Sequence, residues 1–261
     1  MLDKLNHYRH HLNFPLLRQK TSTTQYKFEW VETLKELEEV QRFRAEQFGP
    51  QFGIHFDSGL DQDVYDFGCE HAVLREKWSG EIVAYTRLKH FLGHELAQSY
   101  SAQEFDVVGH LSHVPSVVEI GRTCVHPQFR SGKALSILWL NLVPKILWSM
   151  KAKYLMGCVS IHLDNNAARV YHTHRKIQQL TSAQSLDIAS KHPYEPQHPA
   201  YSFTQDERIP KLFQMYLSMQ ARLSKQAFYD EAFQCLDYFV LLEVNQIAKS
   251  FVMNKRVQRR P

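Results

Sequence analysis

The stretch VVEIGRTCVHPQFRSGKAL, residues 117–135, begins as a buried strand and, after His126 and Pro127, restarts as the front of an apolar helix. Within that strand stand two charged residues, Glu119 and Arg122. Side chains of a regular strand alternate between its two faces, so residues three apart point to opposite sides. A β-bulge, for which Gly121 is the expected position, would bring both charges to one face. The alternative is that the two residues simply pair with other charges at a sheet edge.

The junction that follows this strand is suited to an anion. A helix that begins directly after a short glycine-containing loop presents free backbone N–H groups and the positive end of its dipole. Arg130 and Lys133 add positive charge on either side of Ser131 and Gly132. Such junctions are common, so the spacing alone indicates a phosphate site only weakly.

The segments on both sides predict one α/β domain. Alternating and helical apolar patterns predict, in chain order, a strand at 27–33, a helix at 33–49 ending at Gly49-Pro50, a hairpin of 69–76 with 81–90, short helical pieces in 92–115, a helix at 131–150, a strand at 154–161, helices at 165–177 and 211–225, and a last strand at 235–244. This order predicts a mixed, mostly antiparallel sheet with helices on both faces. The expected divisions are an N-terminal arm (1–25), the single domain (26–250) and a basic C-terminal tail (251–261).

Composition excludes several classes of protein. Of 261 residues, 44% are hydrophobic and 12% aromatic, enough to bury a sizeable core. A net charge of +4 is too small to indicate a nucleic-acid binder. The four cysteines form no CxxC pair, and the histidine-rich segments lack a carboxylate spaced to complete a site, so neither disulfides nor a metal is expected. The absence of a secretory h-region and of an apolar run of about 18 residues predicts a soluble or peripheral protein.

Residues 117–135 resemble the acyl-donor motif of the GNAT superfamily, in which a bulged strand and the following loop and helix hold a phosphopantetheine. The loop departs from the acetyltransferase pattern Arg/Gln-x-x-Gly-x-Gly/Ala, because the only glycine of Arg130-Ser-Gly-Lys-Ala comes one place early; this counts against ordinary acetyl-CoA chemistry. A wider resemblance, over roughly residues 27–245, is to the ornithine-lipid N-acyltransferases. It is carried by EIGRTCVHPQFRSGKAL, YLMGCVSI, GLDQDVYDFGCEHAVL, TRL, IPKLFQMYL and AFYDEAFQCLDYFVLLEV.

The resemblance implies an activity. Members of that family move a 3-hydroxyacyl chain from acyl carrier protein to the α-amine of L-ornithine and so make lyso-ornithine lipid, the first step of ornithine lipid biosynthesis. The family is similar to acyl-homoserine-lactone synthases and N-acyl amino acid synthases, which keep a charged cluster beside the donor. No cofactor is expected beyond the 4′-phosphopantetheine of acyl carrier protein, with CoA as the alternative donor. The positions that fit the charged cluster are Asp63, Asp66, Arg87, Glu119 and Arg122.

Roles for these residues follow as expectations. Glu119 would either remove a proton from the attacking amine or only hold the ammonium. Asp63 and Asp66 would bind the side-chain ammonium, and Arg87 or Arg122 the α-carboxylate; without the resemblance, an Asp-rich loop is usually a solvated turn. The expected donor-binding residues are the backbone of Thr123, Cys124 and Val125 and the phosphate-binding Arg130, Ser131, Gly132 and Lys133.

Other readings stay open at this point. The acceptor could be lysine or an aromatic amino acid, the chain could make a homoserine lactone, it could be a CoA-dependent N-acetyltransferase, or it could be a GNAT-fold module without catalysis. A cytoplasmic enzyme is expected, with acyl carrier protein as its partner and a peripheral contact with the inner membrane as a further option. The basic tail would meet the acidic carrier protein or anionic lipid, or would merely be solvated.

Overall fold

The computed structural model describes residues 25–130, 133–163, 166–194, 209–247 and 249–250. The expected tail and all of the expected arm except Gln25 lie outside these residues. Within the described part, no helix combines the length and the apolar character needed to cross a bilayer.

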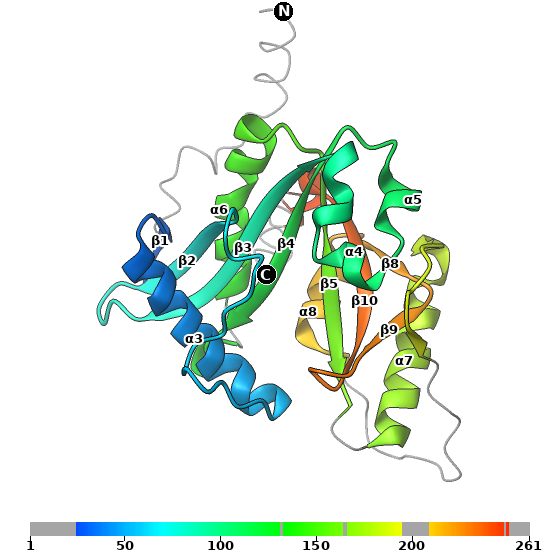
Figure 1. Cartoon of the computed structure of the whole chain (residues 1–261), viewed down its shortest axis with the longest axis horizontal. Helices are drawn as coiled ribbons and strands as arrows, with labels where there is room; N and C mark the ends of the chain where they lie inside the picture. The colour runs from blue at the N-terminus through cyan, green and yellow to red at the C-terminus, as the bar shows by residue number, and fades with distance from the viewer. Residues whose placement is uncertain (1–24, 131–132, 164–165, 195–208, 248, 251–261) are drawn as a thin grey trace, which may run out of the picture.

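One mixed sheet organises the chain, with its strands in the order β1-β2-β3-β4-β5-β10-β8-β6 (Figure 1). Two further short strands extend it, because β9 pairs with β10 and β7 pairs with β9. All pairs are antiparallel except β4 with β5 and β6 with β8. The strands are β1 (Tyr26–Trp30), β2 (Glu70–Glu76), β3 (Ile82–Leu92), β4 (Ser116–Val125), β5 (Tyr154–His162), β6 (Ser185–Leu186), β7 (Pro193–Tyr194), β8 (Arg222–Ser224), β9 (Ala227–Asp230) and β10 (Cys235–Glu243).

Helices cover both faces of the sheet, as the sequence predicts. One core contains apolar side chains of α6 (Ala134–Pro144), α7 (Ala167–Thr181) and α8 (Lys211–Ser218). Two further cores lie on the other face, beneath α3 (Leu34–Phe52) and beneath the short helices η1 (Gly93–Gln98), α4 (Ser101–Glu104) and α5 (Val107–Leu111). The remaining short pieces are η2 (Pro127–Phe129), η3 (Lys145–Ser149) and η4 (Ser182–Gln184).

Helix α3 is longer than its sequence predicts. A capping box fixes its start, where the Thr33 hydroxyl accepts from the Glu36 N–H and the Glu36 carboxylate accepts from the Thr33 N–H. The helix continues through Gly49 and Pro50 and ends where Gly53 adopts a left-handed φ of 68°. A proline one turn from the end removes a single helical hydrogen bond, which explains why it does not stop the helix.

The region after α8 also differs from expectation. The predicted helix at 211–225 stops at Ser218, and the chain then forms β8 and β9. These strands have three and four residues, too few for an alternating pattern to be recognised. Helix α6 is likewise shorter than the predicted 131–150, because after Pro144 it changes to a π-helical turn.

Candidate active site

The two central parallel strands, β4 and β5, pair along only part of their length and then separate. β4 pairs with β5 only through Val117–Tyr154, Val118–Leu155 and Glu119–Met156. In Figure 1 the strands meet at one end and diverge towards the other. A cavity of about 460 Å³ opens in the gap, and both strands line it, from Glu119 to Val125 on β4 and from Cys158 to Ser160 on β5.

A β-bulge lies on β4 at this gap. Tyr85 pairs with Cys124 and Arg87 with Gly121, so Arg122 and Thr123 together face the single residue Thr86. The bulge predicted from the sequence is therefore present, but it is centred at Arg122–Thr123 and not at Gly121. Arg122 carries the left-handed conformation, with φ of 50°. As a result Glu119 and Arg122 both line the cavity.

Three arginines and three aspartates form one ion-pair network beside the cavity. Its centre is Arg44 of α3, which is fully buried and donates to Asp61 Oδ2 at 2.9 Å and to Asp66 at 2.7 and 2.9 Å. Gln41 donates to Asp66 Oδ2 at 3.0 Å. Burial opposes the charge of Asp66, but the hydrogen bonds and charge of Arg44 outweigh it and hold the pKa of this carboxyl far below its usual value.

Arg87 and Arg122 connect this network to the cavity. Arg87 donates to Asp63 Oδ1 at 2.5 Å and to Asp66 Oδ1 at 2.7 Å. Arg122 forms ion pairs through its Nε with Asp61 Oδ2 at 3.3 Å and through its Nη2 with Asp63 Oδ2 at 3.1 Å. Arg122 also lines the cavity, so its guanidinium can contact a ligand there.

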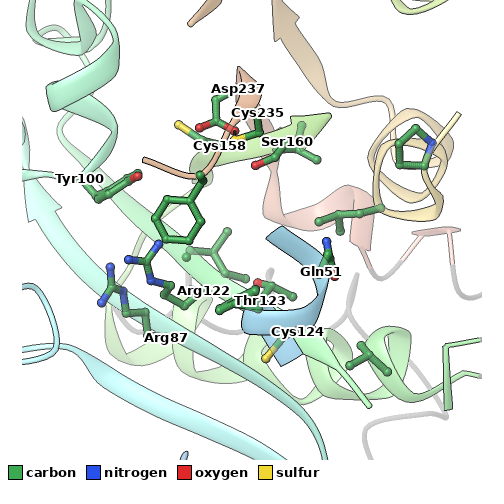
Figure 2. Close-up of a pocket in the computed structure, with 18 of the residues that line it drawn as sticks. Gln51, Arg87, Tyr100, Arg122, Thr123, Cys124, Cys158, Ser160, Cys235 and Asp237 are labelled. Carbon is green, nitrogen blue, oxygen red and sulfur yellow. Dashed lines mark hydrogen bonds between the residues drawn. The ribbon is translucent and has the colours of Figure 1, made fainter. Parts of the chain in front are cut away.

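Two aromatic rings hold the Arg122 guanidinium in place. Its Cζ lies 5.7 Å from the Tyr100 ring centre and 5.0 Å from that of Phe233. Cations over aromatic faces are attracted by the ring quadrupole. Both rings line the cavity, and Figure 2 shows Tyr100, Arg87 and Arg122 on one side of it.

Glu119 lies where the two strands separate and is 8% exposed. Its carboxylate accepts from the backbone N–H of Tyr100 at 3.0 Å and of Ser101 at 2.7 Å, so it fixes the start of α4 against the sheet. Burial raises the pKa of Glu119, although these N–H groups and the charge of Arg87 act in the opposite direction. The carboxylate thus faces the cavity as a base stronger than an exposed glutamate.

The end of β4 presents backbone groups to the gap. The His126 N–H donates to Val83 O on β3. Because N–H groups along an antiparallel strand turn alternately towards and away from the partner, the N–H of Val125 points away from β3, into the gap. The Cys124 side chain instead packs beneath α3 beside Tyr85, and burial raises the pKa of its thiol. Cys124 can therefore act at this site through its backbone only.

Positive charge gathers where β4 leaves the cavity. Arg130 Nε donates to Val125 O at 3.0 Å, and Lys211 Nζ donates to the Arg130 carbonyl at 3.4 Å. Lys133 is exposed at the N-cap of α6. Ser131 and Gly132, which complete the predicted anion loop, lie outside the described residues.

Carboxyl groups gather on the far side of the cavity from the arginines. Figure 2 shows Asp237 there with Cys158, Ser160 and Cys235. Asp237 of β10 is 3% exposed, and one oxygen of Asp230 lies within 4.8 Å of it. Burial, reinforced by the charge of Asp230, raises the pKa of Asp237 to about 6.

Known proteins share this architecture. Residues 41–140 match the model of the acetyltransferase (GNAT) domain family. An L-ornithine N(alpha)-acyltransferase of Rhodobacter capsulatus is 24% identical over 86% of this chain and 92% of its own length. One of Agrobacterium fabrum is 25% identical over 74% of this chain and 70% of its own.

Among solved structures, FeeM, an N-acyl amino acid synthase from uncultured soil microbes, has a TM-score of 0.50 at 10% identity and covers 86% of this chain and 94% of FeeM. The CoA-dependent acyl-homoserine lactone synthase BjaI has a TM-score of 0.50 at 12% identity, over 86% of this chain and 87% of BjaI. These two likenesses show the fold. The chain is an acyltransferase with a GNAT-like fold. The resemblance to the ornithine-lipid N-acyltransferases that the sequence indicates is confirmed.

The structure of the acyltransferase brings the predicted charged residues together. Asp63, Arg87 and Arg122 share ion pairs, and Asp66 joins them through Arg87. Glu119 lines the same cavity as Arg87 and Arg122. The suggestion that Asp63 and Asp66 bind a substrate ammonium stays a prediction, and in the structure both carboxylates already hold arginines.

Sequence reasoning missed Arg44, Asp61 and Asp237. Arg44 lies four residues after Val40 and four before Phe48, on the apolar face of a helix. A charge at such a position needs a buried partner. Asp237 is the one acidic residue within the apolar run CLDYFVLL. Both signals are visible in the sequence, but their partners are not.

Proposed function

We propose that this acyltransferase moves a 3-hydroxyacyl chain from acyl carrier protein to the α-amine of L-ornithine, giving lyso-ornithine lipid. The observation that carries the proposal is the cavity between β4 and β5, where Arg122 lies across from the buried carboxyl group of Asp237. A zwitterion with an additional ammonium needs both kinds of partner. The names of the curated relatives support ornithine as that molecule.

In the proposed reaction the guanidinium of Arg122 binds the α-carboxylate of the acceptor. Arg122 is preorganised for this, because Asp61, Asp63 and two aromatic rings restrict its guanidinium. Asp63 and Asp66 then act by positioning Arg87 and Arg122.

Glu119 removes the proton from the α-ammonium, a role that its raised pKa favours. The free amine attacks the thioester carbonyl, the N–C bond forms and the C–S bond breaks. The backbone N–H of Val125 stabilises the oxyanion of the tetrahedral intermediate. The pantetheine thiolate leaves and takes up the second proton of the attacking nitrogen, Glu119 releases the first proton to solvent, and the phosphate of the donor binds near Arg130, Lys133 and Lys211.

The donor side of the proposal is acyl carrier protein. Its acidic surface complements the positive charge at the mouth of the cavity. Because the product carries a long acyl chain, we expect its release at the cytoplasmic face of the inner membrane.

The test is lipid mass spectrometry of a bacterial host that makes no amino-acid lipids and expresses this chain. A new singly acylated ornithine with a 3-hydroxyacyl amide is the expected product, and it should vanish with Glu119→Gln. A different amino acid in the new lipid would replace ornithine as acceptor. A lipidome without any new amide would overturn the proposal. With the purified protein, turnover of acetyl-CoA but not of acyl carrier protein thioesters would overturn the donor assignment.

A further inference from the structure

We propose that Asp237, with Asp230 and Glu104 beside it, binds the side-chain ammonium of the acceptor and thereby selects diamino acids over neutral amino acids. This assignment rests on the proposed function and deepens it, because it names the residue that recognises the second amine.

Charge balance favours Asp237 over the more obvious aspartates. Asp61, Asp63 and Asp66 are matched by Arg44, Arg87 and Arg122, and every one of the six takes part in an ion pair. A substrate ammonium placed there would have to displace a guanidinium from a buried site. Among the described residues, by contrast, no lysine, arginine or histidine forms an ion pair with Asp237, Asp230 or Glu104.

Glu104 is the second, independent sign that a cation belongs here. The residue is 2% exposed, and neither carboxyl oxygen has a hydrogen-bond partner among the described residues. Burial, reinforced by the charge of Asp237, raises the pKa of Glu104, while the side chains of Cys158 and Tyr100 act in the opposite direction. A buried polar group without a partner costs free energy in the empty protein. A bound ammonium, with three N–H donors, would satisfy several of these oxygens at once.

The position of Asp237 fits the shape of a diamino acid. Asp237 pairs with Ser160 across β10 and β5, and both residues line the cavity. Figure 2 shows this side of the cavity facing Arg87 and Arg122. An acceptor whose α-carboxylate lies at Arg122 and whose α-amine lies at Glu119 would therefore extend its side chain towards Asp237.

The ligand atoms of Asp230, Cys235 and Asp237 lie within 4.8 Å of one another, which also makes a metal ion conceivable. The chemistry of the thiol disfavours it. Burial and the charge of Asp237 raise the pKa of Cys235, so a metal ion would have to displace the proton of this thiol in order to bind it. An ammonium requires no deprotonation of its partners.

The experiment compares ornithine with norvaline, which has the same carbon chain without the second amine. The purified full chain, Asp237→Asn and the control Glu231→Gln, an exposed acid in the turn before β10, are each assayed with a 3-hydroxyacyl carrier protein thioester. Asp237→Asn should lower kcat/KM for ornithine at least about 50-fold, mainly through KM, and leave norvaline unchanged or improved. Glu231→Gln should change neither.

The outcomes separate this assignment from the proposed function. If the unchanged protein acylates neither amino acid, the proposed function fails. If it acylates ornithine and Asp237→Asn does so equally well, only the assignment of Asp237 is overturned. Loss of ornithine activity on dialysis against a chelator, with recovery on adding Zn²⁺ or Mg²⁺, would overturn it in favour of a metal. Thermal unfolding of the variant checks that lost activity does not come from lost structure.

Discussion

Arg44 lies wholly buried where α3 meets the loop between α3 and β2, and its guanidinium reaches both Asp61 and Asp66. Removing one partner from a buried ion pair leaves the other charge desolvated and unpaired. We therefore expect Arg44→Met to lower the free energy of unfolding by about 3–5 kcal/mol. Urea denaturation followed by circular dichroism measures this change.

Arg42 provides the matched control on the same helix. Its exposed ion pair with Glu38, at 2.8 Å, has the i,i+4 spacing whose contribution is only about 0.3–0.5 kcal/mol. Arg42→Met should therefore hardly move the urea midpoint. Equal effects of the two substitutions would show that the Arg44 network does not carry the stability assigned to it.

The raised pKa of Asp237 predicts how the stability of the protein depends on pH. A carboxyl whose pKa rises on folding stabilises the folded state only while it is protonated, so this contribution is lost as pH rises from about 4 through about 6. Asp237→Asn should remove that loss. Above pH 7 the variant should be more stable than the unchanged protein, by up to about 3 kcal/mol, and the difference should shrink towards pH 4. Urea titrations across this range test the sign, and a variant less stable at pH 8 would contradict it.

At the scale of the elements, the gap between β4 and β5 depends on how closely the two strands approach just before it. Gly157 follows the last paired residue of β5, and a Cβ there would collide with the backbone oxygen of Ile120 on β4. Because this oxygen belongs to the backbone of a paired strand, it cannot move aside as the end of a flexible side chain could. Gly157→Ala should therefore destabilise the protein by about 1–3 kcal/mol and lower turnover by moving the two strands apart.

Gly121 is the natural comparison for Gly157. A Cβ at Gly121 would meet Arg87 Nε at 3.6 Å, an ordinary van der Waals contact, and the backbone there is not left-handed. Gly121→Ala should consequently cost much less. Thermal unfolding and initial rates of both variants measure the difference. Equal melting temperatures and equal rates would mean that neither stability nor turnover depends on the close approach of β4 and β5 at Gly157.

For the whole molecule, the sequence predicts what depends on neighbouring residues. The bulged strand, the hairpin of β2 and β3, and the capping box of α3 all follow from local spacing. Arg44, Asp61 and Asp237 escaped because their roles depend on partners 17 or more residues away, or on another strand. The cavity itself arises where pairing between β4 and β5 stops, and residue patterns along one strand do not report where pairing ends.

Arg130 and Lys211 bring positive charge to the place where β4 leaves the cavity, apart from the carboxyls of Asp230 and Asp237. We expect the double substitution Arg130→Ala with Lys211→Ala to raise KM for the carrier-protein thioester about tenfold and to leave KM for the acceptor unchanged. Salt should reproduce part of this effect in the unchanged protein, because exposed charges more than about 8 Å apart are screened at physiological ionic strength. Lys225, which pairs with Asp187 at 3.4 Å, is the control, and Lys225→Ala should leave both constants unchanged. Steady-state kinetics at two salt concentrations measure all of these constants, and a donor KM unaffected by the double substitution would place the carrier protein elsewhere on the surface.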